Sequence, residues 1–154
     1  MSGTSSVKTK STRGTGSVWE LTRLWAPDGH APNLLTQAIA AAIHEFVNYE
    51  KADALVSYAD PNAGHTGGVY RAASWVYQGQ SEENRVYVDA KGQTFARRKF
   101  HSGGDHLNKA EIEAKGFKQL RLPGKHRFAK GLTRRARRDV ARKALRGNPD
   151  GLAR

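Results

Sequence analysis

A short apolar run, a glycine-rich turn and a second apolar segment follow one another between residues 54 and 81. The run begins with Ala54, Leu55 and Val56; it is too short for a helix and predicts a buried strand that ends before Pro61. Apolar residues then recur at the i, i+3, i+4, i+7 spacing of an amphipathic helix, at Val69, Ala72, Ala73 and Val76. This order of strand, loop and helix favours an α/β or α+β fold.

The glycine pair, Gly67 and Gly68, stands where the predicted helix begins. A helix that begins directly after such a turn has unpaired N–H groups in its first turn, and these groups are able to bind a phosphate or a carboxylate. Simple turn formation is the commoner reason for a glycine pair. The segment lacks the lysine and hydroxyl residue of a P-loop and the GxGxxG pattern, so neither a nucleotide triphosphatase nor a nicotinamide enzyme is expected.

Residues 18–48 predict a strand followed by a helix. Residues 18–25 are β-prone, and Pro27 begins a turn after them. The helix is expected to open near Asn33 and to place one apolar face against a core. That face consists of Leu35, Ile39, Ile43, Phe46 and Val47.

Two β-hairpins are predicted in the second half of the chain. One surrounds the turn Lys91-Gly92 and the other the turn Pro123-Gly124. A polar loop and a short helix are expected between them. In chain order the segments are residues 85–90 and 93–98 (strands), 101–106 (loop), 108–114 (helix), and 117–122 and 125–130 (strands).

The chain has 154 residues and no cysteine, which excludes disulfides, a zinc–thiolate site and a cysteine nucleophile. Its length fits one domain with tails. We expect a flexible, Ser/Thr/Gly-rich arm at 1–16, the folded domain at 17–132 and a basic helix or tail at 133–154. No segment resembles a secretory signal or reaches the roughly 20 apolar residues of a membrane span, so a cytoplasmic protein is expected.

The net charge of +12 is concentrated at one end of the chain. Half of the 26 lysines and arginines lie in residues 118–154, where the acids are Asp139 and Asp150. A helix is expected between a cap at Thr133 and an end at Gly147. Its apolar stripe is formed by Leu132, Ala136, Val140 and Ala144, and its cations include Arg134, Arg135, Arg137, Arg138, Arg142 and Lys143.

A concentrated basic segment on a balanced domain favours a polyanionic partner, and we expect double-stranded DNA. A solvated tail, an anionic membrane surface and RNA are the alternatives. Because no aromatic residue follows Leu132, this segment is expected to contact phosphates rather than to stack on bases. Such contacts give affinity without sequence preference and weaken steeply with salt.

The segment SYADPNAGHTGGVYRAASWVYQG, residues 57–79, resembles the central motif of the phage Mom-type DNA-modification proteins, a divergent branch of the GNAT acyltransferase superfamily. Residues 22–28, TRLWAPD, and residues 125–128, KHRF, are similar to shorter motifs of the same family. The central match is long and specific. With the two flanking motifs it covers about residues 18–132.

The resemblance implies a GNAT-like catalytic domain over 17–132, with a mixed sheet flanked by helices. It also implies that a small acyl-derived group, of the methylcarbamoyl or acetamido type, is attached to N6 of adenine and protects phage DNA from restriction. The donor would be acetyl-CoA or a related acyl-CoA, with its pyrophosphate at the start of the helix after residues 54–60. The residues expected to hold it are Tyr58, Ala59, Thr66, Gly67, Gly68, Val69 and Arg71.

Asp60 and His65 are the candidate acid and base, because they flank the loop between the predicted strand and helix. A turn cap is the simpler role for an aspartate before proline, and plain exposure is the simpler role for a loop histidine. Tyr70 is a candidate proton donor to the leaving group, and Ser57 a candidate contact for a substrate carbonyl.

Adenine must leave the base stack before its N6 amine is accessible, so an aromatic pocket is expected to receive it. We favour Tyr70 as a functional residue and Trp75 as a core residue. The aromatic candidates for the pocket are Trp25, Tyr58, Tyr70, Trp75 and Tyr77.

Further cations near the matched motifs, Arg23, Lys125, His126 and Arg127, are expected to contact DNA or cofactor phosphates, with plain surface charge as the alternative. A metal site would combine Asp60 and His65 with one of His101, His106 or His126. No close pair such as HxxxH is present, so no metal is expected. The oligomeric state is not predicted.

Two other functions remain open. The first is a GNAT-fold acyltransferase that acts on a protein, a small amine or RNA, which would bind and turn over acyl-CoA with no product on DNA. The second is a non-catalytic DNA-binding protein of the same fold, which would bind duplex through residues 133–146 and have no cofactor site.

Overall fold

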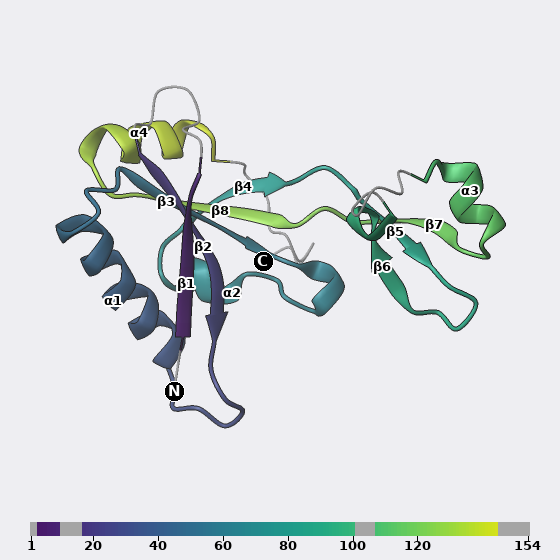
Figure 1. The fold of residues 1–154 in the computed structure, drawn as a ribbon. Coiled ribbons are helices and arrows are strands. Elements are labelled where there is room, and N and C mark those ends of the chain that lie inside the picture. Colours follow the sequence, from purple (N-terminus) through teal and green to yellow (C-terminus); the bar gives the residue numbers. More distant parts are fainter. Residues whose placement is uncertain (1–2, 10–16, 101–106, 145–154) are drawn as a thin grey trace, which may run out of the picture. The chain divides into compact units, whose positions relative to one another are not determined.

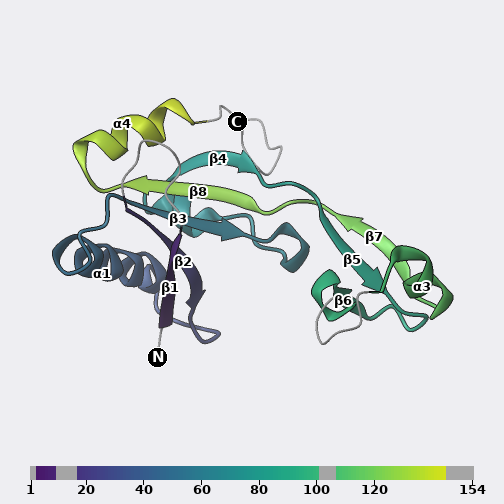
Figure 2. The same ribbon diagram turned by 45° about the horizontal axis from the view of Figure 1, so that its top comes forward.

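The computed structural model describes residues 3–9, 17–100 and 107–144 (Figures 1 and 2). This part of the chain divides into two compact units. The first comprises the described residues up to Ser81 and from Lys125 onward, and the second comprises Glu82–Gly124.

The first unit is built on a five-stranded mixed sheet (Figure 1). Its strand order is β1-β2-β3-β8-β4. β2 and β3 are parallel and joined through helix α1, whereas the other neighbours are antiparallel. The bounds are Gly3–Thr9 (β1), Val18–Trp25 (β2), Leu34–Asn48 (α1), Ala54–Ala59 (β3), Val76–Gln80 (β4) and His126–Gly131 (β8).

Helices cover both faces of this sheet (Figures 1 and 2). Leu55 and Ala59 join Ile39 and Phe128 in a core beneath α1 and the short helix α2, Gly68–Ala72. The alternate residues of β3 belong to a second core beneath α4, Arg134–Arg142. That core consists of Val18, Ala54, Val56, Ala129, Ala136 and Val140. Because β3 is buried on both faces, it is a continuous apolar run.

These elements confirm the predicted mixed α+β fold. The individual predictions of β2, of α1 with its N-cap at Asn33, and of β3 are confirmed as well. The GNAT-like arrangement stays a prediction. The expected arm at 1–16 is wrong for Gly3–Thr9, which pairs with β2 as strand β1. Without β1, β2 would be an edge strand with unpaired backbone groups, and a polar segment is able to pair with such groups without large apolar side chains.

The predicted helix from Val69 to Val76 is wrong beyond Ala72. Ser74 adopts a left-handed φ of 59°, and Val76 begins β4, which pairs with β8. Lys130 of β8 donates hydrogen bonds from its Nζ to the carbonyl oxygens of Ala73 (3.0 Å) and Ser74 (3.2 Å), so a residue distant in sequence satisfies the end of the helix. A helical spacing over eight residues does not outweigh the pairing of an aromatic-rich segment with a buried strand.

The second unit contains a three-stranded antiparallel sheet in the order β6-β5-β7 (Figure 2). Helix α3 begins at Asn108 with a capping box. The core contains Tyr87, Phe100 and Ile112. The bounds are Asn84–Val88 (β5), Thr94–Ala96 (β6), Lys109–Ala114 (α3) and Lys118–Leu122 (β7), with a 3-10 turn at Arg97–Phe100.

The first predicted hairpin is confirmed as β5 and β6, and the predicted helix as α3. The second hairpin is wrong, because β7 pairs with β5 while β8 pairs with β3 and β4. Both strands form, but Phe128 of β8 is fully buried and needs the core of the first unit. A turn at Pro123-Gly124 carries no information about these distant partners. The predicted loop at 101–106 lies outside the described residues.

The basic helix α4 is docked on β8 in the same unit as the sheet. Thr133 caps it, since its hydroxyl oxygen accepts from the Ala136 N–H at 3.2 Å. Gly131 permits the close approach, because a Cβ there would collide with the backbone of Ala136 and Arg137. The helix ends at Arg142 rather than at Gly147, which lies outside the described residues. The domain boundary expected between residues 132 and 133 therefore lies inside the first unit. The single domain expected at residues 17–132 spans both units.

Candidate functional site: a cleft at the ends of β2 and β3

A cleft of about 530 Å³ opens in the first unit where β2 and β3 end and α2 begins. Parallel strands end at the same edge of a sheet, and ligands of α/β folds commonly bind there. The cleft gathers ten predicted residues: Arg23, Trp25, Tyr58, Ala59, His65, Thr66, Gly67, Gly68, Val69 and Tyr70. Its other lining residues, which sequence reasoning missed, are Thr22, Leu24, Leu35 and Gly64.

Tyr70 is a wall of the cleft and a member of the core. It is 7% exposed, and its ring centroid lies 5.3 Å from those of Trp75 and Phe128. Burial raises the pKa of the Tyr70 hydroxyl, and the hydrogen bond with Ser57 only partly opposes this. Tyr70 is therefore a neutral phenol at physiological pH.

The hydroxyl of Ser57 lies 2.8 Å from the Leu21 carbonyl oxygen and 2.7 Å from the Tyr70 hydroxyl oxygen. A carbonyl oxygen only accepts, so the single Ser57 hydrogen is best placed toward Leu21, and Tyr70 then donates to Ser57. Ser57 is 1% exposed and does not line the cleft. The expected contact between Ser57 and a substrate carbonyl is therefore wrong for this arrangement, in which Ser57 positions Tyr70.

Asp60 lies beside the cleft but does not line it. Its Oδ1 accepts from the backbone N–H of Asn62 (3.0 Å) and from Asn62 Nδ2 (2.9 Å), which caps the 3-10 turn Pro61–Ala63. Lys125 Nζ lies 3.4 Å from Oδ2. Partial burial raises the pKa of Asp60, but the hydrogen bonds from Asn62 and the charge of Lys125 outweigh it, so the pKa is lowered overall. This geometry is that of an ionised turn cap.

His65 is an exposed residue on the wall of the cleft. Its backbone N–H donates to the carbonyl oxygen of Asp60 at 3.0 Å, so the turn that Asp60 caps also fixes the position of His65. Within the described residues the two side chains make no hydrogen bond to each other. They are therefore linked through the backbone, not as an acid–base pair.

The structure explains the glycines at positions 67 and 68 in different ways. Gly67 has a φ of +80°, and a Cβ at this position would collide with the ring of Phe128. Gly68 has an ordinary φ, and a Cβ there would meet only Thr66 Oγ1, at 3.9 Å. Packing thus explains Gly67, whereas the bare backbone at Gly68 is open toward the cleft that it lines.

Several predicted residues lie elsewhere. Arg71, Trp75 and Tyr77 do not line the cleft. Trp75 is 5% exposed, which confirms it as a core residue, and Tyr77 is part of β4. His126 is 5% exposed, and its Nδ1 lies 3.2 Å from the Tyr77 hydroxyl oxygen. A phosphate contact by His126 is therefore wrong, because the ring is buried.

The predicted nucleic-acid contacts at residues 134–143 form a basic surface on α4 and at its end, whereas Arg23 lines the cleft, Lys125 lies beside Asp60 and Arg127 belongs to β8. Around its buried residues, Ala136 and Val140, the helix carries exposed Arg134, Arg135, Arg137, Arg138 and Arg142, and exposed Lys143 follows at its end. Asp139 is the acid of this helix, and it lies 3.8 Å from Arg142. The surface is therefore strongly cationic.

Within the part of the chain that the structure describes, no three His, Asp or Glu side chains gather as metal ligands. His101 and His106 lie outside the described residues. No helix of residues 3–9, 17–100 and 107–144 is long and apolar enough to span a membrane.

No curated protein matches the chain. The model of the Mom protein family matches residues 1–147, which include the strand, loop and helix around the cleft as well as α4. The match extends over nearly the whole sequence, and the chain belongs to the Mom protein family.

Proposed function

We propose that this protein modifies adenine in double-stranded phage DNA, attaching a small acyl-derived group of the methylcarbamoyl or acetamido type to the N6 amine, and thereby protects the DNA from restriction. The family match over residues 1–147 carries the proposal. The cleft supports it, because its walls come largely from the segments that resemble the central and first flanking Mom motifs.

The size and walls of the cleft suit an extruded base. The N6 amine of adenine becomes accessible when the nucleotide is flipped out of the stack. A cleft of about 530 Å³ lies within the roughly 300–1,000 Å³ usual for small-molecule sites. Trp25, which is 59% exposed, and Tyr58 offer aromatic surfaces in its wall.

His65 is the proposed base. The exocyclic amine is a weak nucleophile and must lose a proton when it forms its new bond. A histidine is suited to accept a proton near neutral pH, and His65 is exposed in the cleft. Tyr70 is less suited to be the acid, because its proton is directed to Ser57 and that chain ends at a carbonyl. Its oxygen retains lone pairs that are able to accept an amine hydrogen and orient the nucleophile.

We propose acetyl-CoA or a related acyl-CoA as the donor and GNAT-type chemistry, by analogy. When bound, this group would supply the activated acyl carbon, to which N6 would bond as the carbon–sulfur bond breaks and the thiol leaves. Because acetyl-CoA alone would give an acetyl group, a methylcarbamoyl or acetamido-type product requires a related acyl-CoA whose acyl group contains nitrogen. The backbone at Thr66, Gly67 and Gly68 fits its phosphates, because no side chain at Gly68 blocks an approach to the main chain. Helix α2 has only five residues, so local N–H groups rather than a helix dipole would bind the anion.

Mass spectrometry of deoxynucleosides tests the proposed function. Plasmid DNA from cells that express the protein is compared with DNA from cells that carry the empty vector. A heavier deoxyadenosine in the first sample alone is expected, and its added mass identifies the transferred group. Unmodified deoxyadenosine alongside folded protein would contradict the proposal and favour acyl transfer to another amine or DNA binding without catalysis.

A further inference from the structure

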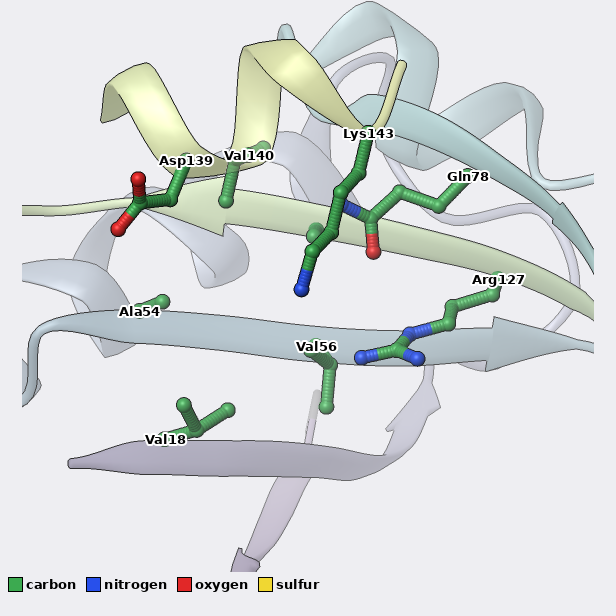
Figure 3. A pocket seen from close by; sticks show the side chains of 9 residues that line it. Val18, Ala54, Val56, Gln78, Arg127, Asp139, Val140 and Lys143 are labelled. Atoms are coloured by element: carbon green, nitrogen blue, oxygen red, sulfur yellow. The ribbon is translucent and has the colours of Figure 1, made fainter. Parts of the chain in front are cut away.

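A small pocket lies between α4 and the sheet, on the face of β3 that carries Val56 (Figure 3). Apolar side chains form its floor, and Gln78, Arg127 and Lys143 stand at its rim. The lining residues are Val18, Ala54, Val56, Gln78, Arg127, Ala129, Asp139, Val140 and Lys143. All of them belong to the first unit.

Two cations meet in this pocket without a carboxylate between them. Figure 3 shows the Lys143 amino group and the Arg127 guanidinium extending toward the floor of the pocket, while the Asp139 carboxylate points away from both. Asp139 lies 3.8 Å from Arg142 instead. Within residues 3–9, 17–100 and 107–144, neither Arg127 nor Lys143 takes part in an ion pair.

Arg127 also has an unsatisfied donor. Its Nε is buried and has no hydrogen-bond partner within the described residues. A buried donor without a partner is unfavourable, and a charged one especially so. Because Lys143 adds a second positive charge nearby, an anion is the partner that satisfies both groups.

The size of the pocket limits what this anion is. Its cavity of about 20 Å³ accommodates roughly one water-sized group. A nucleotide base or a cofactor does not fit, whereas one oxygen of a phosphate does, with the remainder of the phosphate outside. A backbone phosphate of DNA meets this condition because it presents non-bridging oxygens at the surface of the duplex.

The pocket is adjacent to the cleft through strand pairing. Arg127 of β8 pairs with Tyr58 of β3, and Tyr58 lines the cleft. Directly paired residues of antiparallel strands have Cβ atoms roughly 4.5–5.5 Å apart on the same face. A phosphate bound at Arg127 therefore lies beside Tyr58 on the α4 face of the sheet. The cleft, whose residues Ala59 and Tyr70 belong to the core on the α1 and α2 face, opens across the end of β3 from it.

We propose that Arg127 and Lys143, assisted by Gln78, bind one DNA backbone phosphate next to the nucleotide that enters the cleft. This inference rests on the proposed function and adds that the DNA strand binds in one fixed position relative to the cleft. One phosphate is held at the rim of the site, while the arginines of α4 contact the flanking backbone. Arg127 and Lys143 act as positioning residues, because they hold the strand and not the reacting base.

The test measures DNA binding by fluorescence anisotropy over a range of salt concentrations. Arg127→Gln and Lys143→Gln are compared with Lys91→Gln, which removes an exposed charge in the second unit. Each pocket variant is expected to lower the slope of log affinity against log salt by about one, as for one lost phosphate contact, while Lys91→Gln leaves it unchanged. Lys143 is exposed, so its variant remains informative if Arg127→Gln fails to fold.

A methylphosphonate scan locates the contact. Neutralising one phosphate at a time along a duplex is expected to weaken wild-type binding most at a position beside the target adenine, and Arg127→Gln is expected to abolish the effect of that position alone. Pocket variants that keep the wild-type slope and the wild-type scan would overturn the phosphate site. Wild-type protein that fails to bind DNA at all would instead overturn the proposed function, so the two failures are distinguishable.

Discussion

The hydroxyl oxygens of Tyr70 and Ser57 lie 2.7 Å apart, and Ser57 lies 2.8 Å from the Leu21 carbonyl. This chain joins the wall of the cleft to the backbone of β2. It fixes a neutral phenol at the site and uses the serine hydroxyl as an internal link. The activity of Tyr70 should therefore depend on its position and neutral state.

Tyr70→Phe is expected to reduce modification and to cost about 1 kcal/mol of unfolding free energy, because one buried hydrogen bond is lost. Ser57→Ala is the matched control, since it breaks the same link and keeps the Tyr70 oxygen. Nucleoside mass spectrometry and chemical denaturation report the two effects. Equal loss of modification in both variants would show that the link matters rather than the Tyr70 oxygen.

The stability of the protein should fall in alkaline solution. Burial raises the pKa of Tyr70 above its usual value of 10.0, so the native state holds this proton more tightly than the unfolded chain does. The resulting stabilisation is complete below pH 10 and is lost as the pH rises through the native pKa. Tyr70→Phe should remove part of this decline in denaturation curves. The rest of the decline should remain, because burial also raises the pKa of Tyr77. A variant with the wild-type alkaline decline would contradict this account.

The stability should also fall in acid, through Asp60. Its net lowered pKa means that its ionised form stabilises the native state above the ordinary value of 3.8, and that this contribution disappears as the pH falls through the native pKa. Asp60→Ala is expected to cost about 1 kcal/mol at neutral pH, as for a lost cap. Asp60→Asn retains an oxygen for the Asn62 N–H and should cost less. Thermal melts between pH 2 and roughly 7 check this prediction, given the usual range of aspartate pKa values; an Asp60→Asn protein with undiminished acid sensitivity would be inconsistent with it.

Gly67→Ala should lower the stability of the protein, whereas Gly68→Ala should lower its activity. Gly67→Ala forces a side chain into a left-handed backbone and against Phe128, so we expect a loss of about 2–4 kcal/mol in unfolding free energy. Gly68→Ala should change stability by less than about 1 kcal/mol. It should nevertheless reduce modification, because its methyl group occupies the approach to the backbone. Thermal melts and nucleoside analysis separate these effects, and full activity of folded Gly68→Ala would exclude a ligand contact with this backbone.

Much of the fold follows from local patterns. The strand at Ala54–Ala59, helix α1 from Asn33, and the Thr133 cap of α4 were predictable because each depends on short-range periodicity or on one capping side chain. Strand pairing was not. β7 and β8 are separated by only a few residues but pair in different sheets. Val76 completes a helical apolar spacing but begins β4, which pairs with β8. These outcomes depend on long-range partners such as Phe128.

The candidate site was predictable where it is contiguous in sequence. The segment from Tyr58 to Tyr70 supplies most of the cleft, and the motif at 22–28 supplies Arg23 and Trp25. Leu35 gave no signal, because on a helix it is indistinguishable from a core leucine. Gln78 was missed because strand β4, which contains it, was not predicted. The link between Ser57 and Tyr70 becomes visible only when β3 and α2 are packed together.

The most direct test of the central claim compares nucleosides from DNA modified by two histidine variants. His65→Asn removes the proposed base from the cleft, while His44→Asn changes another exposed histidine, on α1, that does not line the cleft. We predict that modified deoxyadenosine disappears with His65→Asn and persists with His44→Asn, in cells that contain equal amounts of folded protein. Undiminished modification by His65→Asn would contradict the assignment of His65 as the base in this cleft.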